Sequence, residues 1–203
     1  MNLPLRIVLA TNNAKKLQEL RRIISSAGLA VEVLGLADFP TYPEPEETER
    51  TFEGNALLKA TAAAERTGEV AVADDSGLEV DELGGMPGVR SARWAGPECD
   101  DDANNALLLA QLHGVPRERR GARFVCALAM VTPDGDQRVW HGYLPGRITD
   151  TEPAGEHGFG YDPLFIPDGL DVTSAELSPS EKDAISHRGA AVREFVAYLG
   201  GLA

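Results

Sequence analysis

The sequence predicts an α/β protein in which a mixed β-sheet is flanked by helices. In the first half of the chain, short β-favouring runs alternate with segments whose apolar residues recur at helical spacing. In the second half, two β-favouring runs lie on either side of Pro133-Asp134-Gly135, a turn sequence that predicts an antiparallel hairpin. Because this strand pair interrupts the alternation, we expect a mixed sheet rather than a purely parallel one.

The first half of the chain predicts two strands and two helices before Asp74-Asp75. Leu17, Leu20 and Ile24 recur at helical spacing, and a later segment is rich in alanine, a strong helix former. The proline- and acid-rich residues 38–49 predict a loop. The expected elements are strand 6–11, helix 15–26, strand 31–34 and helix 52–66.

An acidic pair, Asp74-Asp75, follows the apolar run 70–73 and precedes Gly77. We expect the strand to end at these acids in a glycine turn and to resume over 78–80. Further along, Asp100 or Asp101 is expected to cap a helix that runs to about His113. The remaining expected elements are strands 124–132 and 138–144, a glycine-rich loop over 155–163 and a helix over 190–199.

Composition narrows the class of protein. The 203 residues carry a formal net charge of −13, which repels a phosphate backbone and makes nucleic acid a poor partner. The acid excess is itself typical of a solvated surface. Two cysteines offer neither a disulfide framework nor a zinc site. Without a leader-like start or a long apolar run, we expect a soluble, unsecreted, cytoplasmic protein with no membrane partner, folded as one domain or two closely associated lobes.

The junction Thr11-Asn12-Asn13-Ala14-Lys15-Lys16 combines a hydroxyl, amides and two cations where a strand meets a helix. A triphosphate could use both the amide groups of the helix start and the lysine charge. The alternative is a capped surface helix, because the segment lacks the Gly-Lys-Ser/Thr ending of a P-loop.

Carboxylates supply a second candidate site. Asp74 and Asp75 repel each other unless hydrogen bonds, a metal or a raised pKa offset the repulsion, although an ordinary Asp-Asp-Ser-Gly turn is the alternative. Glu46-Glu47 precede a helix whose Asn55 and Lys59 are four residues apart, so one helix face can line a pocket. Dipole complementation and a solvated lysine would explain the same residues.

The last third of the chain holds residues suited to a base and an anion. Phe159-Gly160-Tyr161-Asp162 joins aromatic faces to backbone freedom and an acceptor, although a core-packed aromatic turn explains it equally well. Lys182, His187 and Arg188 place three donors near a helix start and are typical of an anion clamp, with exposed charges as the alternative.

Taken in order, these motifs resemble the inosine/xanthosine triphosphate pyrophosphatase family over nearly the whole chain. Connecting segments such as Leu83-Gly84-Gly85-Met86-Pro87-Gly88 are also similar to that family. The motifs are Thr11-Asn12-Asn13-Ala14-Lys15-Lys16, Glu47, Lys59, Ala73-Asp74-Asp75-Ser76-Gly77-Leu78, Phe159-Gly160-Tyr161-Asp162, Lys182 and Ser186-His187-Arg188-Gly189.

The resemblance implies a single nucleoside triphosphate pyrophosphatase domain over 1–203, with an elongated mixed sheet and two lobes around a central substrate cleft. It implies hydrolysis of ITP, dITP or XTP to the monophosphate and pyrophosphate, with Mg²⁺, in a cytosolic homodimer. One departure is Asn12, where bacterial relatives often have glycine.

The resemblance also assigns roles to residues. Asp75 is expected to be the general base, Glu47 and Asp75 to serve magnesium, and Glu46 is the alternative to Glu47. The expected substrate-binding residues are Thr11, Asn12, Asn13, Ala14, Lys15, Lys16 and Lys59 at the phosphates, Ser76 beside the substrate, and Phe159, Gly160, Tyr161, Asp162, Lys182, His187 and Arg188 around the base and sugar.

Two rival functions stay open from the sequence. One is a pyrophosphatase of the related septum-formation-inhibitor class, which would act on modified pyrimidine triphosphates. The other is a nucleotide sensor that binds through the same phosphate corner without hydrolysis. The paired carboxylates argue against a sensor.

Overall fold

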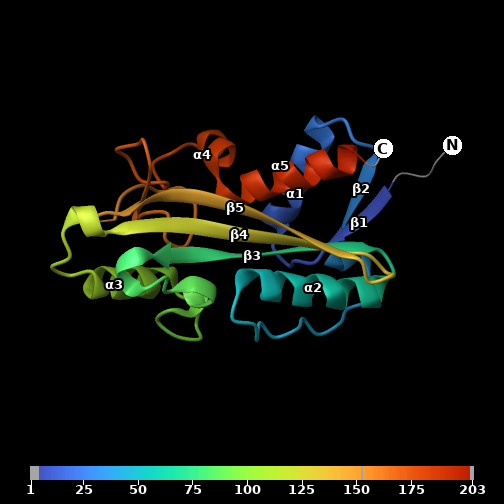
Figure 1. Ribbon diagram of the computed structural model, residues 1–203, viewed down its shortest axis with the longest axis horizontal. Coiled ribbons are helices and arrows are strands. Elements are labelled where there is room, and N and C mark those ends of the chain that lie inside the picture. Colours follow the sequence, from blue (N-terminus) through green and yellow to red (C-terminus); the bar gives the residue numbers. More distant parts are fainter. Residues whose placement is uncertain (1–4, 152, 202–203) are drawn as a thin grey trace. The chain divides into compact units, whose positions relative to one another are not determined.

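The computed structural model describes residues 5–151 and 153–201, and its chain divides into two compact units (Figure 1). Unit 1 contains the chain up to Asp75, Ala127–His141 and the chain from Ala190 onward. Unit 2 contains Ser76–Cys126 and Gly142–Gly189. The chain passes from unit 1 to unit 2 between two consecutive residues of one strand, Asp75 and Ser76.

One six-stranded sheet, in the order β2-β1-β3-β4-β5-β6, contains every named strand of the described residues. β1 pairs in parallel with both β2 and β3, whereas β5 and β6 are antiparallel, so the predicted mixed α/β fold is confirmed. The strands are β1 (Leu5–Leu9), β2 (Val31–Gly35), β3 (Val70–Val80), β4 (Gly121–Val131), β5 (Gln137–Ile148) and β6 (Phe165–Pro167).

β4 and β5 form the predicted hairpin. They are neighbours in the sheet, and only residues 132–136 join them. Within this turn the Thr132 N–H donates to the Asp136 carbonyl at 2.9 Å, and the Gly135 N–H donates to the Thr132 carbonyl at 2.9 Å. Gly135 has φ +91°, a backbone conformation that glycine adopts without steric cost.

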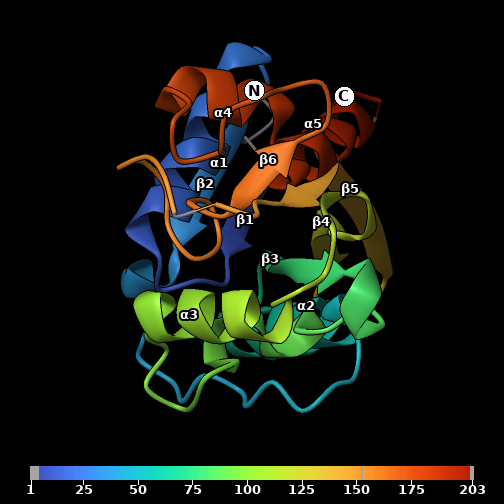
Figure 2. The same ribbon diagram turned by 90° about the vertical axis from the view of Figure 1, so that its left-hand side faces the viewer.

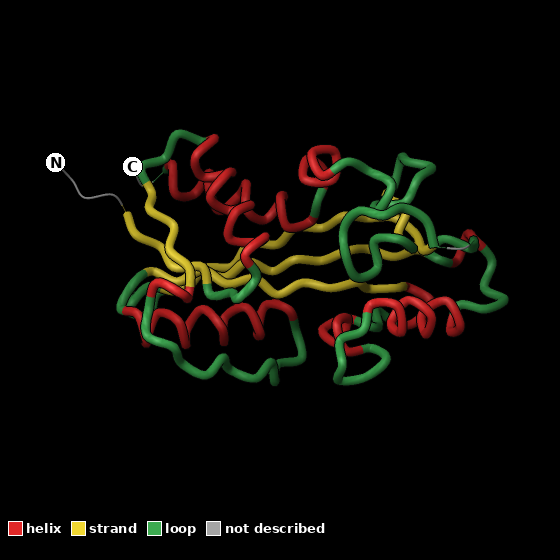
Figure 3. The backbone as a smooth tube through the Cα atoms, turned by 180° about the vertical axis from the view of Figure 1, so that it is seen from behind, coloured by secondary structure: helices red, strands yellow, loops and turns green. Residues whose placement is uncertain are grey.

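In unit 1, helices cover both faces of the strands. α1 (Ala14–Ser26) and the unit 1 part of α5 (His187–Gly200) lie on one face, and α2 (Phe52–Thr67) lies on the other (Figures 1 and 3). α1 buries Leu20 and Ile24, which are one turn apart. α2 buries a stripe of small residues, which lets the helix lie close to the sheet. These residues are Ala56, Ala60, Ala63 and Ala64.

In unit 2, α3 (Asp101–Gln111) packs against the ends of the central strands (Figure 2). Leu108 and Leu112 belong to one buried cluster with Leu78 of β3 and Phe124 of β4. The α3 helix begins at the expected cap, because the Asp100 carboxylate accepts from the Ala103 N–H at 3.1 Å. The short elements of the described residues are α4 (Pro179–Ile185), η1 (Leu36–Asp38), η2 (Asp81–Leu83), η3 (Gly88–Arg93) and η4 (Arg117–Arg119).

The structure corrects one expectation about the acidic pair. Asp74 and Asp75 do not end a strand in a glycine turn, because β3 continues without a break from Val70 to Val80. Its start pairs with β1, and its end lies beside the start of β4, where Glu79 forms an ion pair with Arg123 at 2.7 Å. Pairing with neighbouring strands overrides the local turn preference of Asp, Ser and Gly.

A buried arginine ties the end of α3 to β5 in unit 2. The Arg120 guanidinium donates to the carbonyls of Leu112 at 2.9 Å, Val115 at 3.0 Å and Thr149 at 2.6 Å. The Leu112 carbonyl follows the last residue of α3, where helix carbonyls lack partners within the helix. One side chain therefore satisfies three carbonyls from two segments, one after α3 and one after β5.

We expect Arg120→Ala to lower the free energy of unfolding by about 3 kcal/mol, because it removes three hydrogen bonds from the interior, and of the three carbonyls the Leu112 carbonyl keeps the Val115 N–H as a donor. Urea unfolding followed by circular dichroism measures the loss. The neighbouring Arg119→Ala is the control. It removes a largely exposed ion pair with Glu82 and should cost less than about 1 kcal/mol. Equal losses in the two variants would contradict the structural role of Arg120.

Candidate active site

The corner between β1 and α1 is built by local hydrogen bonds. The Thr11 hydroxyl accepts from the Asn13 N–H at 3.1 Å, and the Asn13 side chain accepts from the Lys16 N–H at 3.3 Å. Asn13 therefore caps α1, as its position at the strand-to-helix junction predicted. Two amide donors of this corner, the N–H groups of Asn13 and Lys16, are thus engaged within the protein.

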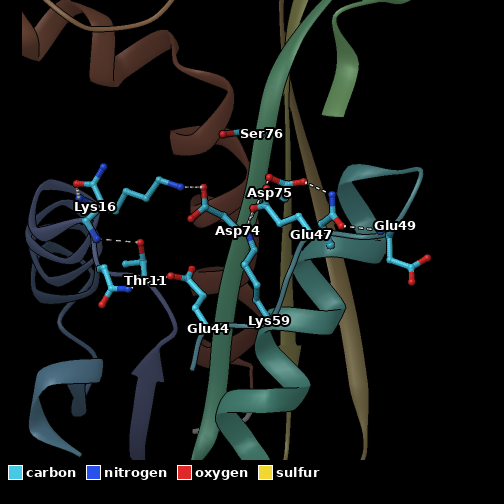
Figure 4. Close-up of polar contacts among 12 residues, drawn as sticks. Thr11, Lys16, Glu44, Glu47, Glu49, Lys59, Asp74, Asp75 and Ser76 are labelled. Carbon is cyan, nitrogen blue, oxygen red and sulfur yellow. Dashed lines mark hydrogen bonds and ion pairs between the residues drawn. The ribbon is translucent and has the colours of Figure 1, made fainter. Parts of the chain in front are cut away.

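The acidic pair points to opposite faces of β3, because side chains alternate along a strand. On one face, Lys16 of α1 forms an ion pair with Asp74 at 2.7 Å. On the other face, Asp75 lies beside α2 and Glu47 (Figure 4). The two adjacent carboxylates therefore pair with different lysines. Each meets a lysine from the helix that covers its own face.

Asp75 is held by two residues of one α2 face. The Asn55 amide donates to Asp75 Oδ2 at 3.0 Å, and the Lys59 ammonium lies 3.6 Å from Asp75 Oδ1. Asn55 is almost fully buried, and its Oδ1 accepts from the Glu49 N–H at 3.0 Å. Lys59 also donates to Glu47 Oε1 at 2.9 Å. Asn55 and Lys59 therefore fix Asp75 and at the same time hold the acidic loop that precedes α2.

The surroundings shift the protonation of this group. Burial raises the pKa of Asp75, and the negative charges of Glu47 and Asp74 act in the same direction, whereas Lys59 and the Asn55 hydrogen bond oppose the rise. Burial lowers the pKa of Lys59, but Asp75 and Glu47 outweigh it and the net pKa is raised. A carboxylate with a raised pKa beside a firmly charged lysine is suited to accept a proton from water.

The carboxylates around Lys59 have the chemistry of a hard-cation site. Glu47 and Asp75 both contact the Lys59 ammonium, so their oxygens lie within reach of a single ion. Magnesium sites commonly use one or two carboxylates together with substrate phosphates and waters. Residues 5–151 and 153–201 contain no cluster of three or more His, Cys, Asp or Glu suited to a metal. The donor set therefore fits Mg²⁺ only if substrate oxygens complete it.

In unit 2, a second group forms around the loop before β6. Asp162 is buried, accepts from the Phe159 N–H at 2.9 Å and forms an ion pair with Lys182 of α4. The Lys182 ammonium also lies 5.1 Å from the centre of the Phe159 ring, a cation–π distance. Phe159 itself is 56% exposed, so its ring is open to a flat ligand.

His187 and Arg188 form the first turn of α5. The Ser186 hydroxyl accepts from the Gly189 N–H at 2.9 Å and caps the helix. The His187 ring stacks on Phe124, with 5.0 Å between the ring centres and 13° between the planes. Arg188 donates to the Ser76 hydroxyl at 3.2 Å. The structure thus brings Arg188 and Ser76 together within unit 2.

Of the remaining expected site residues, some lie in the core and others at the surface. Tyr161 is buried, and its hydroxyl donates to the Ser91 carbonyl at 2.9 Å, so the core-packed alternative describes this residue. Asn12 is exposed and donates to Glu44 at 2.9 Å. Ala14 is the first residue of α1, and Glu46 is exposed. The side chain of Lys15 lies outside the described part of the chain.

Two residues of these clusters were missed as site residues. The sequence places Asn55 on the same helix face as Lys59 but assigns it no role, and a polar residue amid alanines is the signal that points to it. Asp74 is identified from the sequence only as one half of a pair. Its own partner could not be read from the sequence because Lys16 is 58 residues away.

A mixed α/β fold whose central strand carries a lysine–carboxylate pair on each face has the groups of an acid–base enzyme that handles anions. The Ham1 family model matches residues 7–198 of the chain. The chain belongs to the Ham1 family, and the resemblance drawn from its motifs is confirmed.

Relatives and solved structures agree with this assignment. A dITP/XTP pyrophosphatase of Nocardia farcinica is 60% identical and covers 98% of this chain and 96% of its own. One of Frankia alni is 60% identical, with 96% and 97% covered. A crystal structure of the dITP/XTP pyrophosphatase of Mycobacterium abscessus is 53% identical, covers 98% and 100%, and has a TM-score of 0.81. The Ham1 protein of Staphylococcus aureus is 42% identical over 98% and 100%, with a TM-score of 0.88.

We expect Asp75→Asn to raise the midpoint of thermal unfolding at pH 7. A carboxyl whose folded pKa is raised contributes stability below its unfolded pKa and loses that contribution as pH rises through the folded value. The ionised side chain therefore weakens the fold at neutral pH, and the neutral amide should not. Lys59 keeps Glu47 as a partner in this variant. Each kcal/mol gained corresponds to about 2–4 °C.

The matched variant is Asp74→Asn, which leaves Lys16 without its carboxylate. We expect this variant to be less stable by about 2 kcal/mol. Differential scanning calorimetry between pH 4 and 8 compares the two. A similar loss of stability in both variants would contradict the expectation that ionised Asp75 weakens the fold whereas Asp74 stabilises it.

Proposed function

We propose that this protein hydrolyses the non-standard purine nucleoside triphosphates dITP, XTP and ITP to the monophosphate and pyrophosphate, and so clears them from the nucleotide pool. Support comes from membership of the Ham1 family and from relatives of 52–60% identity over nearly their full length that are named dITP/XTP pyrophosphatases. The observation that carries the proposal is the fixed, partly buried Asp75 carboxylate between Asn55 and Lys59.

Residues of unit 1 are assigned to the phosphates. Thr11 to Lys16 would hold them at the start of α1, where the helix dipole favours negative charge. Lys16 and Lys59 would neutralise phosphate oxygens, and each already faces a carboxylate in the structure. A phosphate oxygen that replaced one of these carboxylates would take over its contact with the lysine ammonium.

Asp75 is assigned the role of general base. It would orient a water molecule and take one of its protons while the oxygen attacks the α-phosphorus. The bond from the α-phosphorus to its bridging oxygen then breaks, and pyrophosphate leaves with the electron pair, stabilised by lysine charge. The raised pKa of Asp75 makes its carboxylate a stronger base. The carboxylate would therefore accept a proton from the attacking water more readily.

Magnesium would be held by Glu47 and Asp75, and Glu47 is preferred over Glu46 because it contacts Lys59 beside Asp75. When bound, the ion supplies charge neutralisation and polarises a phosphoryl oxygen.

Among the described residues, no helix is long and apolar enough to cross a membrane. On the family resemblance we further propose a cytoplasmic homodimer in which residues 1–203 form one pyrophosphatase domain.

Residues of unit 2 are assigned to the base and sugar. Phe159 offers an exposed aromatic face, with Asp162 and Lys182 behind it. The Arg188 guanidinium carries only donors and the His187 ring can supply an N–H, and such donors would suit the O6 acceptor of hypoxanthine and xanthine and oppose the amino group of adenine. Guanine would be rejected at its 2-amino group, since a buried donor without a partner costs about 1–3 kcal/mol.

A panel of triphosphates tests the function. We expect pyrophosphate release from dITP, ITP and XTP that exceeds release from dATP, dGTP, dTTP and UTP by at least about a hundredfold in kcat/KM and that requires Mg²⁺. Asp75→Asn, measured beside the wild type, should lose at least about a thousandfold in kcat and still bind dITP.

Preference for dTTP or UTP would instead indicate the septum-formation-inhibitor class. Binding of dITP without release of pyrophosphate at any Mg²⁺ concentration would indicate a sensor. Near-normal turnover by Asp75→Asn would exclude this residue as the base.

We expect Arg188→Ala to weaken discrimination between bases. Loss of a donor to O6 should reduce kcat/KM for dITP about tenfold and leave that for dATP nearly unchanged. Arg193→Ala, on the exposed side of the same helix, is the control. Unchanged selectivity in a folded Arg188→Ala variant would refute the assigned role.

A further inference from the structure

Two side chains of α3 contact both polar groups of a single residue in the loop before β6. The Asp101 carboxylate accepts from the Gly160 N–H at 2.7 Å, and the Asn105 amide donates to the Gly160 carbonyl at 3.0 Å. Asp101 and Asn105 are four residues apart and therefore lie on the same helix face. All three residues belong to unit 2.

The backbone conformation of this loop depends on such contacts. Gly160 has φ +61°, in the left-handed region, and open space surrounds the position of a Cβ atom there. The preceding Phe159 side chain is 56% exposed, so core packing does not fix its ring. Besides its contact with Lys182, the orientation of the ring depends on the backbone on either side of it, and that backbone is held by hydrogen bonds.

We propose that Asp101 and Asn105 are positioning residues that set the orientation of the Phe159–Gly160 peptides and thereby the aromatic face offered to the purine base. This inference rests on the proposed function. It adds a second layer to the site, because neither residue is itself assigned to touch the nucleotide. Asp101 binds the N–H of Gly160 and Asn105 binds its carbonyl. Together the two contacts fix both the position and the tilt of the turn.

The chemistry of Asn105 supports a role beyond packing. It is buried, with 7% exposure, and its Oδ1 has no hydrogen-bond partner among the described residues. A buried acceptor without a partner weakens a fold, so an apolar residue would suit the core of α3 better. The amide instead provides a donor directed at the Gly160 carbonyl.

A separate tether keeps the loop attached when these contacts are removed. The buried Tyr161 ring packs in the core cluster of unit 2, and its hydroxyl donates to the Ser91 carbonyl at 2.9 Å. The Asp162 carboxylate also accepts from the Phe159 N–H at 2.9 Å. Variants of α3 should therefore alter the tilt of the turn without unfolding it.

The test uses Asp101→Ala, Asp101→Asn and Asn105→Ala in the full chain, with Asp102→Ala as the matched control. Asp102 is exposed and lies in the same first turn of α3, so its removal changes the helix-end charge equally. Asp101→Asn retains an oxygen that can accept from the Gly160 N–H and is the conservative rescue variant.

We expect Asp101→Ala and Asn105→Ala to raise KM for dITP about tenfold and to narrow the preference for dITP over dATP, with kcat changed less than about threefold. Asp101→Asn and Asp102→Ala should stay within about twofold of the wild type in KM. Amide exchange of Gly160, followed by NMR, should accelerate in Asp101→Ala and stay near the wild-type rate in Asp102→Ala.

A wild-type KM and base preference in both alanine variants, with Gly160 exchange accelerated, would overturn the positioning role. An equal rise of KM in Asp102→Ala would overturn it as well, since charge alone would then explain the effect. Absence of wild-type turnover on every triphosphate would be a failure of the proposed function. In that case unchanged Gly160 exchange in Asp101→Ala would separately reject the contact on which the positioning role depends.

Discussion

The central constraint of this structure is the placement of two adjacent carboxylates within a continuous strand. Asp74 and Asp75 follow each other in β3, and the pleat sends them to opposite faces of the sheet. Each charge is then offset by a lysine of the helix on that face, Lys16 of α1 or Lys59 of α2. Both helices are thereby tied to one strand at consecutive residues, and the repulsion between the two carboxylates is weaker than it would be on one face.

Much of unit 1 could be predicted from its sequence because the signals are local. The helical spacing of Leu20 and Ile24 and the alanine stripe of α2 report which faces are buried, and Pro133-Asp134-Gly135 marks the hairpin. The continuity of β3 could not be read this way. Asp, Ser and Gly have low strand propensity, and pairing with β1 and β4, which lie far away in sequence, decides their conformation.

The candidate site shows a similar division. Spacing within α2 placed Asn55 and Lys59 on one face, but the partner of that face, Asp75, is supplied by a strand 20 residues beyond Asn55. Contacts of this kind follow from the fold and not from local pattern. Short elements such as β6 and α4 were missed for the reverse reason, since three and seven residues are too few to show a period.

The same contacts explain why the carboxylate of β3 that faces α2 is the one suited to proton transfer. Asp74 forms an ion pair with Lys16 on its own face. Asp75 also contacts a lysine, but it shares that cation with Glu47. Burial raises the pKa of Asp75, and the repulsion from Glu47 adds to the rise. Asn55 holds the geometry without neutralising the charge. A carboxylate that is fixed in place and whose ionised form is disfavoured by burial is suited to accept a proton, so the arrangement that makes Asp75 reactive also makes its ionised form a weak point of the fold.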